Sequence, residues 1–226
     1  MGTEALDKCL KAIFQLAGDN DRATTAGLAE QLAIAPASVT GMLKKLSEAD
    51  PPWIEYQKHH GARLTDRGRA RALEIIRHHR LIELFLYRVL DYSWDEVHME
   101  AEKLEHAISE TFEDRIAHVL GDPEFDPHGH PIPRRDGTLP DRADSDLIDM
   151  EPGTDAEVSR VSDHDPTMLQ HLSSIGVRPG VRIHLLERRP FDGPLMLRVG
   201  DDQAVHAFGT RLAGSIRIRD IRSAAA

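Results

Sequence analysis

The chain is poor in the features that mark exported proteins, membrane proteins and multi-cysteine zinc proteins. Cys9 is the one cysteine among 226 residues, which excludes an internal disulfide and a zinc site built from several cysteines. No apolar stretch has membrane-spanning length, and the N-terminus lacks a basic segment followed by an apolar run. We therefore expect a cytoplasmic protein that has no membrane partner.

Negative charge exceeds positive charge, but the excess is unevenly distributed. The formal net charge of -10 argues against a protein that coats nucleic acid non-specifically. Residues 41–80 nevertheless carry nine Lys and Arg against five Asp and Glu, whereas residues 81–160 carry seven against twenty-one. A basic segment followed by an acidic one indicates that one part meets phosphate and another meets cations.

The acidic half contains oxygen and nitrogen donors at helical spacing. Four of them leave one face of a helix together, since successive residues are rotated by about 100°; they are His98, Glu102, Glu105 and His106. His79 and Glu83 repeat the one-turn spacing, and residues 91–95 are enough for a turn between two helices. Two such helices facing each other are typical of a metal site, although acidic helix faces are also often simply solvated. Apolar residues between the donors favour the metal site, because partly desolvated carboxylates require a positive partner.

The first 70 residues have the pattern of a DNA-binding module. Helices are expected over residues 4–17, 25–32 and 37–46, with Thr24 and Thr25 as capping residues and Pro36 in the first turn of the third helix. Two short strands around a basic turn follow, at residues 53–56 and 62–65, and then a long helix from about Arg67 to Val89. A helix-turn-helix followed by a hairpin predicts a winged helix, whose third helix enters the major groove.

Residues on the exposed face of the third helix and on the wing are the expected DNA contacts. They are Pro36, Ala37, Ser38, Thr40, Gly41, Lys44, Lys45 and Arg63. The basic side chains neutralise phosphates and fix the register, and the small residues favour close backbone approach and contact with thymine methyls. The alternative is a winged helix that contacts only protein.

Taken together, these motifs resemble the diphtheria-toxin-repressor family of iron- and manganese-dependent transcriptional regulators. The resemblance extends over nearly the whole chain. It is carried by the winged helix with Ala37-Ser-Val-Thr40 and Leu64-Thr-Asp-Arg-Gly68, by His78–Glu83, by Val97–His106 and by Asp126-Pro-His-Gly-His-Pro-Ile-Pro133.

The resemblance implies two metal sites per subunit. One, the ancillary site, would use His79, Glu83 and His98, and the other, the primary site, would use Glu102, Glu105 and His106. Iron regulators of the family tend to have cysteine at the position of Glu102, and manganese regulators tend to have glutamate there. A site of oxygen and imidazole donors also favours Mn²⁺ or Fe²⁺ over softer ions. We therefore expect Mn²⁺ first and Fe²⁺ second.

Two departures from the family pattern affect these expectations. The family takes a further ligand from the first helix, and an ungapped alignment puts Lys8 there, which cannot bind a metal when protonated. Asp7 is the expected substitute, with Glu4 and Cys9 as rivals. In the second departure, Asp126 replaces a small polar group that helps to hold an anion.

The 126–133 motif therefore has two interpretations. With Arg80 and His130, Asp126 would form an anion site or supply the negative charge itself. Alternatively the Pro-rich stretch is only a rigid turn, in which His128 and His130 are surface or structural residues rather than ligands.

The last third of the chain is different in composition. Short strands are expected at residues 158–161, 181–186, 195–199, 204–208 and 215–218, with a short helix at 166–172, which indicates a small β-barrel. It resembles the SH3-like domain of the same family and of the iron-transport protein FeoA. In relatives this domain can lend a carboxylate to the ancillary site, and Asp163 and Asp165 are the candidates here, ahead of His164. The alternative is that this Asp-His-Asp run is only a polar loop.

The expected fold is mainly α with β, in three domains. Residues 1–70 form the winged helix, 71–140 a helical metal-binding and dimerisation domain, 141–157 a linker, and 158–226 an SH3-like, FeoA-type barrel. We expect a homodimeric regulator, most simply a repressor of metal-uptake genes, that binds double-stranded DNA at a pseudo-palindromic operator. The rivals are a di-metal carboxylate and histidine enzyme, against which no separate catalytic constellation is present, and a winged-helix regulator with a degenerate metal site.

Overall fold

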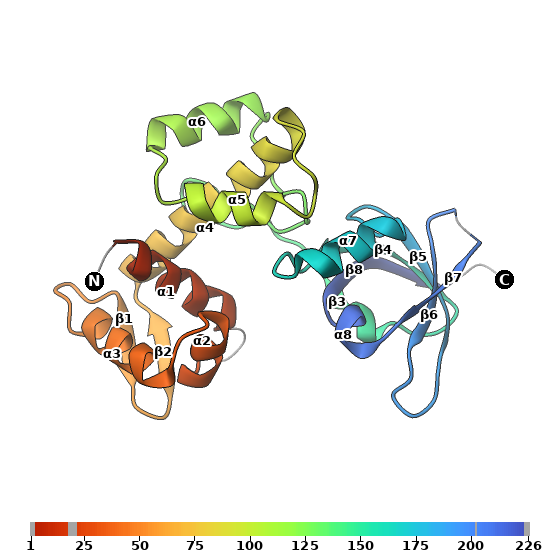
Figure 1. Ribbon diagram of the computed structural model, residues 1–226, viewed down its shortest axis with the longest axis horizontal. Coiled ribbons are helices and arrows are strands. Elements are labelled where there is room, and N and C mark those ends of the chain that lie inside the picture. Colours follow the sequence, from red (N-terminus) through yellow and green to blue (C-terminus); the bar gives the residue numbers. More distant parts are fainter. Residues whose placement is uncertain (1–2, 18–21, 202, 224–226) are drawn as a thin grey trace. The chain divides into compact units, whose positions relative to one another are not determined.

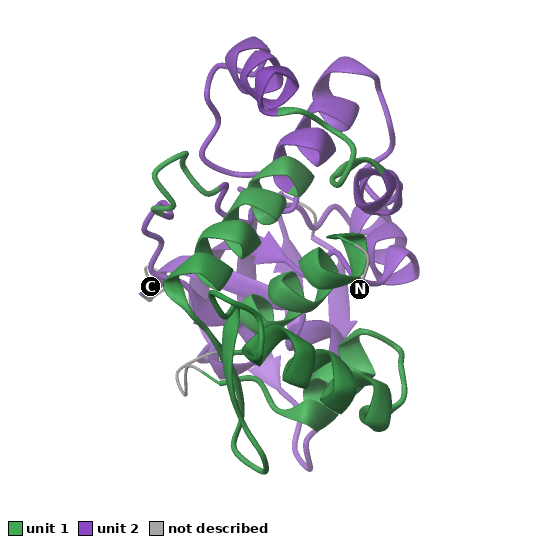
Figure 2. Ribbon diagram, turned by 90° about the vertical axis from the view of Figure 1, so that its left-hand side faces the viewer, with its two compact units in different colours: residues 1–79, 104–109, 133–138 green, residues 80–103, 110–132, 139–226 purple. Residues whose placement is uncertain are grey.

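The computed structural model describes residues 3–17, 22–201 and 203–223, and these fall into two compact units. Unit 1 contains the described part of residues 1–79 together with 104–109 and 133–138 (Figure 2). Unit 2 contains 80–103, 110–132 and the described part of 139–226. Each unit is discontinuous in sequence, and the expected domain boundaries remain predictions.

Unit 1 is built on a winged helix, as predicted. Its elements are α1 (Thr3–Leu16), α2 (Thr25–Gln31), α3 (Pro36–Ser47), the antiparallel strands β1 (Ile54–Gln57) and β2 (Gly61–Leu64), and the start of α4 (Asp66–Val89) (Figure 1). The Thr24 side chain caps α2 by accepting from the Gly27 N–H, and Pro36 begins α3. The predicted helix-turn-helix and hairpin are therefore confirmed.

One apolar core joins α1 to α2 and α3, the helices of the helix-turn-helix. Leu10 and Ile13 of α1 are fully buried in the same cluster as Leu28 of α2 and Leu43 of α3. Burying a side chain of this size contributes about 1.5–3 kcal/mol to stability. The position of α1 is therefore fixed by the core that also fixes α3.

Unit 2 combines helical segments with a β-barrel. α5 (Val97–Leu104) and α6 (Glu110–Val119) precede the barrel strands β3 (Ser145–Asp146), β4 (Thr154–Val161), β5 (Arg182–Arg188), β6 (Leu195–Val199), β7 (Val205–Phe208) and β8 (Ile216–Ser223). These strands form one antiparallel sheet in the order β3-β8-β4-β5-β6-β7. The short helices η2 (Leu147–Asp149), α7 (Pro166–Ser174) and α8 (Thr210–Ala213) lie between them in sequence. The predicted barrel is confirmed.

The structure differs from the sequence-based expectations at several short elements. The expected linker over residues 141–157 contains β3, η2 and the start of β4, and neither α6 nor α8 was expected. Elements of two to four residues are too short to show hydrophobic periodicity, which explains β3, η2 and α8. α5 ends at Leu104, so Glu105 and His106 lie in the turn that follows rather than on the helix.

A loop and a turn inside unit 2 bring the segment around Trp94 onto the barrel core. Trp94 is buried among the barrel residues, and its ring N–H donates to the Pro127 carbonyl (2.9 Å). His128 Nε2 in turn donates to the Trp94 carbonyl (2.9 Å). Gly129 completes the turn with a φ of +89°, and a Cβ there would lie 2.2 Å from the Ser159 carbonyl oxygen of β4.

Among the described residues, no helix is both long and apolar enough to cross a membrane.

Gly129→Ala should destabilise unit 2 by more than backbone strain alone. Alanine at positive φ costs about 1 kcal/mol, and the clash with β4 adds about 1–3 kcal/mol. Gly180→Ala is the matched control, because Gly180 has a φ of +90° and open space around its Cβ position. Urea unfolding of the two variants measures the difference in their free energies of unfolding. Equal losses of stability would show that the close approach to β4 adds nothing to the cost of the Gly129 substitution.

Candidate metal centres and DNA-binding surface

The buried carboxylate of Glu105 is the centre of a polar cluster in unit 1. Glu105 is 1% exposed, and its Oε2 accepts hydrogen bonds from Lys11 Nζ (2.8 Å) and His79 Nδ1 (2.5 Å). His78 Nδ1 contacts its backbone carbonyl (3.1 Å). Burial raises the pKa of Glu105, but the hydrogen bond and charge of His79 and the Lys11 ammonium outweigh it and lower the pKa to about 2. Glu105 is therefore ionised at neutral pH.

His106 lies between two carboxylates. Its Nδ1 is 3.3 Å from Asp7 Oδ2 and its Nε2 is 3.3 Å from Glu105 Oε1. Both His106 Nε2 and Glu105 Oε1 are buried without a hydrogen-bond partner. Neighbouring ligands of an octahedral ion, each about 2.1 Å from it, lie roughly 3 Å apart. The two orphaned atoms therefore have the chemistry and spacing of adjacent metal ligands.

Asp7 was the expected replacement for the missing ligand at Lys8, and the structure places it beside His106. It is fully buried, and Arg71 donates to both of its oxygens, from Nε to Oδ1 and from Nη2 to Oδ2, at 2.7 Å each. The hydrogen bond from Arg71 to Asp7 is the main reason that the pKa of Arg71 is raised. Asp7 thus has the position of a carboxylate that orients a ligating imidazole.

Glu102 and the rivals for the first-helix ligand are less constrained. Glu102 is half-buried on α5, whereas Glu4 is exposed and pairs with Lys8 at 2.8 Å. Cys9 is buried, and burial raises the pKa of its thiol to about 12, which keeps it protonated. Among the described residues, the groups of three or more donors within 4.8 Å do not include Glu102, Glu105 or His106.

A second cluster of donors lies in unit 2. Ligand atoms of Glu83, His98 and Asp163 lie within 4.8 Å of one another, with His98 Nδ1 3.1 Å from Glu83 Oε1 and 3.6 Å from Asp163 Oδ2. His79 precedes Glu83 by one turn of α4. Burial raises the pKa of Asp163, but the charges of His130 and His98 outweigh it and lower that pKa. These donors suit a divalent ion with nitrogen and oxygen ligands.

Asp165, the other carboxylate considered from the barrel, has a different role. Its Oδ1 accepts from the N–H groups of Thr167 and Met168, which caps α7, and its Oδ2 pairs with Arg211 at 2.9 Å. The expectation that Asp165 is a metal ligand is therefore not supported by its position. Asp163 is the barrel carboxylate that reaches the cluster.

The turn at residues 126–130 contributes further buried polar groups. Asp126 Oδ1 accepts from the N–H groups of His128 and His130 (2.8 and 2.9 Å), and Asp126 Oδ2 lies 3.7 Å from Arg80 Nε. His128 is fully buried, which rules out the surface interpretation for that residue, whereas 16% of the His130 side chain is exposed. His128 Nδ1 has no hydrogen-bond partner, and a ligand atom of His128 lies within 4.8 Å of Glu83 and Asp126.

The geometry around Arg80 fits the internal-charge interpretation of Asp126. The Arg80 side chain is 13% exposed, and its guanidinium also donates to the Pro131 carbonyl. Burial lowers the pKa of His130, but the charges of Asp126 and Asp163 outweigh it and raise that pKa. Arg80 and His130 thus face two carboxylates, Asp126 and Asp163, so an external anion is not required to balance positive charge at this turn.

Sequence reasoning missed Lys11 and Arg71, and it gave His128 no ligand role. Lys11 and Arg71 neutralise Glu105 and Asp7, and His128 joins Glu83 and Asp126. A signal existed for Lys11, because it is one turn from Asp7 on a helix whose other inward positions are apolar. The partners of Arg71 and His128 are distant in sequence, and no local spacing indicates them.

The expected DNA-contact residues lie on the outer face of α3 and on the wing. Pro36, Ala37, Ser38, Gly41, Lys44 and Lys45 are exposed, whereas Val39 and Leu43 point into the core. A Cβ added at Gly41 would meet no atom within 4 Å. Thr40 is half-buried and its hydroxyl donates to the Pro36 carbonyl (3.0 Å), so this group is already engaged.

The basic residues of the wing differ in whether their charge is paired within the protein. Arg63 donates from Nε and Nη2 to the two oxygens of Glu55 (2.8 and 2.9 Å), so its charge is paired in the free protein. Lys58 at the tip is exposed. Arg67 stacks over the Trp53 ring with its guanidinium carbon 3.4 Å from the ring centre, which fixes the start of α4 against the hairpin.

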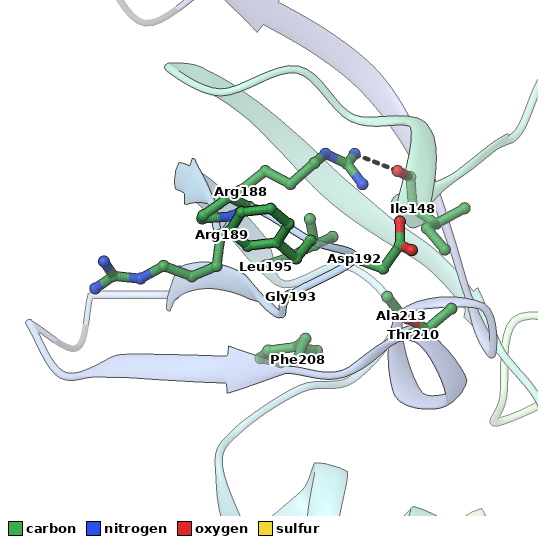
Figure 3. Close-up of a pocket in the computed structure, with 11 residues that line it drawn as sticks. Ile148, Arg188, Arg189, Asp192, Gly193, Leu195, Phe208, Thr210 and Ala213 are labelled. Carbon is green, nitrogen blue, oxygen red and sulfur yellow. Dashed lines mark hydrogen bonds between the residues drawn. The ribbon is translucent and has the colours of Figure 1, made fainter.

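A groove on the barrel does not carry comparable chemistry. It lies beside the turn between β5 and β6 and is lined by Arg188, Leu195 and Phe208, among others. Figure 3 shows Arg188 reaching the carbonyl of Ile148 while Arg189 points away from the groove. Arg189 pairs with Glu187 at 2.9 Å. The two arginines that line the groove are therefore engaged within the protein.

Comparison with known proteins agrees with this arrangement. Residues 1–62 match the model of the iron dependent repressor N-terminal DNA binding domain, 65–134 the iron dependent repressor metal binding and dimerisation domain, and 146–220 the FeoA domain. The iron-dependent repressor IdeR of Mycobacterium tuberculosis H37Rv is 29% identical over 205 residues, which cover 85% of this chain and 88% of that protein.

Solved structures give a similar result. A manganese-dependent transcriptional repressor in complex with manganese is 37% identical, with a TM-score of 0.87, and the match covers 94% of this chain and 98% of that one. ScaR with bound Cd²⁺ is 30% identical, with a TM-score of 0.81, over 95% of this chain and 98% of that one.

The winged helix, the carboxylate and histidine clusters and the barrel together define a class of metal-responsive transcriptional regulators. Within that class, the matched domains and the similarity over nearly the full length identify the family. The chain belongs to the diphtheria-toxin-repressor family of iron- and manganese-dependent transcriptional regulators.

Asp7→Asn should destabilise unit 1 strongly. It removes a buried charge that Arg71 binds through two hydrogen bonds, and breaking such a pair costs about 3–5 kcal/mol. Glu74→Gln is the matched control, because Glu74 pairs with the same guanidinium but is 38% exposed, and surface pairs contribute about 0–1 kcal/mol. Urea unfolding followed by circular dichroism measures both, and similar small losses would contradict the role of Asp7.

Gly41→Ala should weaken DNA binding without destabilising the protein. The methyl group has open space in the free protein, and alanine is favoured over glycine in a helix by about 1 kcal/mol. If the α3 backbone approaches the bases closely, the methyl group blocks that approach and affinity falls about tenfold or more, the equivalent of about 1.4 kcal/mol. Thermal melting and fluorescence anisotropy test the two effects, and unchanged affinity would show that α3 does not approach DNA at this position.

Proposed function

We propose that the protein is a homodimeric repressor of metal-uptake genes that uses Mn²⁺, or alternatively Fe²⁺, as its corepressor. The observation that carries this proposal is the pair of buried, unpartnered ligand atoms, Glu105 Oε1 and His106 Nε2, 3.3 Å apart in the same unit as the winged helix. Glu102, Glu105 and His106 would hold the ion. A divalent ion would supply two positive charges where ionised carboxylates lie in a buried environment.

The donor set and the relatives support manganese as the first choice. Oxygen and imidazole ligands suit Mn²⁺ and Fe²⁺, and the cysteine that would favour a softer ion is absent at position 102. The similar solved structures include a manganese-dependent repressor bound to manganese. The matched domain models are described as those of iron dependent repressors, which keeps Fe²⁺ as the alternative.

Asp7 acts on this site through His106 in our proposal, rather than as a direct ligand. Both of its oxygens accept from Arg71, and Oδ2 faces His106 Nδ1. An imidazole whose Nδ1–H is held by a carboxylate presents Nε2 to a metal in one orientation. With this role for Asp7, the site would need neither a ligand at Lys8 nor a shift in the start of α1.

The second cluster would hold another ion with a mainly structural role. Glu83, His98 and Asp163 would be its ligands, with His79 from the preceding turn of α4. Within unit 2, Glu83 comes from α4, His98 from α5 and Asp163 from the segment after β4. An ion there would stabilise the folded state by mass action, as any ligand of the native state does.

The switch is a linkage between metal and DNA. An ion that binds better to the arrangement in which both recognition helices of a dimer reach successive major grooves necessarily tightens DNA binding by the same factor. The dimer also predicts a pseudo-palindromic operator. The exposed basic residues of α3 predict a strong salt dependence of affinity.

Glu102→Ala should abolish the effect of metal on DNA binding. Full-length protein is titrated onto a pool of promoter fragments from the genome of the organism that encodes it. The salt concentration is fixed, and Mn²⁺, Fe²⁺ or Zn²⁺ is added. In the wild type, Mn²⁺ should tighten binding to specific fragments by about 10–100-fold, a coupling of 1–3 kcal/mol.

Glu100→Ala is the matched control, because Glu100 lies on the same helix but pairs with Lys103 at the surface (2.8 Å). It should keep the wild-type response to metal. If wild-type DNA binding is indifferent to every ion, the metal centres are structural and the proposed switch is wrong. A larger response to Fe²⁺ than to Mn²⁺ at equal free concentration would select the alternative ion.

A further inference from the structure

Lys11 places a positive charge where the primary metal site is proposed. It lies on α1, is 8% exposed, and its ammonium is 2.8 Å from Glu105 Oε2. A lysine so deeply buried is strongly disfavoured unless a negative partner compensates its charge. Glu105 is that partner, and it is itself 1% exposed.

The two oxygens of Glu105 have different surroundings. Oε2 accepts from both Lys11 and His79, whereas Oε1 has no hydrogen-bond partner and faces His106 Nε2. An ion that is bound through Oε1 and His106 would therefore share this carboxylate with an ammonium group already attached to its other oxygen. Two like charges so close repel each other strongly in a buried environment.

We propose that Lys11 is an internal cation that competes with the metal ion for Glu105 and thereby sets the metal concentration at which the protein responds. The proposal rests on the proposed function, since it concerns the same site. In the metal-free protein, Lys11 satisfies the carboxylate and stabilises the fold. When metal binds, that ion pair is lost or strained, so the affinity for metal is lower than the ligands alone would give.

Lys8 provides a control on the same helix. It precedes Lys11 by three residues, and it pairs at 2.8 Å with Glu4, with both side chains largely exposed. Lys8→Met and Lys11→Met thus make the same chemical change, one at the surface and one beside a buried carboxylate. Lys11→Arg keeps the charge, and Lys11→Gln keeps a hydrogen-bond donor without the charge.

The test uses the full-length protein and two measurements. Isothermal titration calorimetry with Mn²⁺ gives the dissociation constant of each site, and the site of interest is the one lost when His106→Ala is added. Thermal melting without metal and with saturating Mn²⁺ gives a second measurement that does not depend on DNA binding.

Removal of the charge should tighten metal binding and weaken the metal-free fold. Lys11→Met and Lys11→Gln should lower the dissociation constant for Mn²⁺ by about 10–100-fold, lower the metal-free melting temperature, and enlarge the rise caused by Mn²⁺. Lys11→Arg and Lys8→Met should remain close to the wild type. The glutamine variant keeps the test valid if the methionine variant does not fold.

The outcomes separate this proposal from the proposed function. If the wild type responds to Mn²⁺ and the uncharged variants bind Mn²⁺ no more tightly, the proposed competition by Lys11 is wrong. The proposed function as a manganese-dependent regulator is then still supported. If only the uncharged variants bind Mn²⁺ at this site, the competition is supported and the wild type is not a manganese switch. If neither binds it there, both proposals are wrong.

Discussion

The buried carboxylate of Glu105 is the group on which the geometry of unit 1 depends. It joins α1 through Lys11, α4 through His79, and the turn after α5, to which it belongs. An ionised group this deeply buried is tolerated only because neighbouring donors and a positive charge compensate it. Since the partners come from distant parts of the chain, any change in what Glu105 binds changes forces on all three segments.

Local rules were sufficient to predict the winged helix, the long helix α4 and the barrel. Thr24 and Pro36 mark helix starts, and β5 and β6 could be predicted because they have several residues and defined turns on either side. Likewise, the donors His98 and Glu83 were identified by spacing because each belongs to a helix. Each of these features depends on residues within one or two turns of each other.

The rest of the site depends on contacts that no spacing encodes. Asp7 could be proposed as a substitute for Lys8, but its two hydrogen bonds with Arg71 join residues 64 positions apart. Helical periodicity continued past Leu104, whereas α5 ends there, which moves Glu105 and His106 into a turn. Asp163 and Asp165 were equivalent in sequence. Only the fold distinguishes the residue that joins the cluster from the one that caps α7.

In the proposed switch, α1 connects the candidate primary site to the recognition helix. The helix has Asp7 and Lys11 among its polar contacts, and Leu10 and Ile13 pack in the core that also contains Leu43 of α3. Close-packed cores resist gradual deformation, so α1 and α3 respond together when the groups holding α1 change. Lys11 in the metal-free protein and an ion in the loaded one would hold α1 differently. In the proposed mechanism, metal biases the recognition helix through that difference, rather than through the ion's charge felt at a distance.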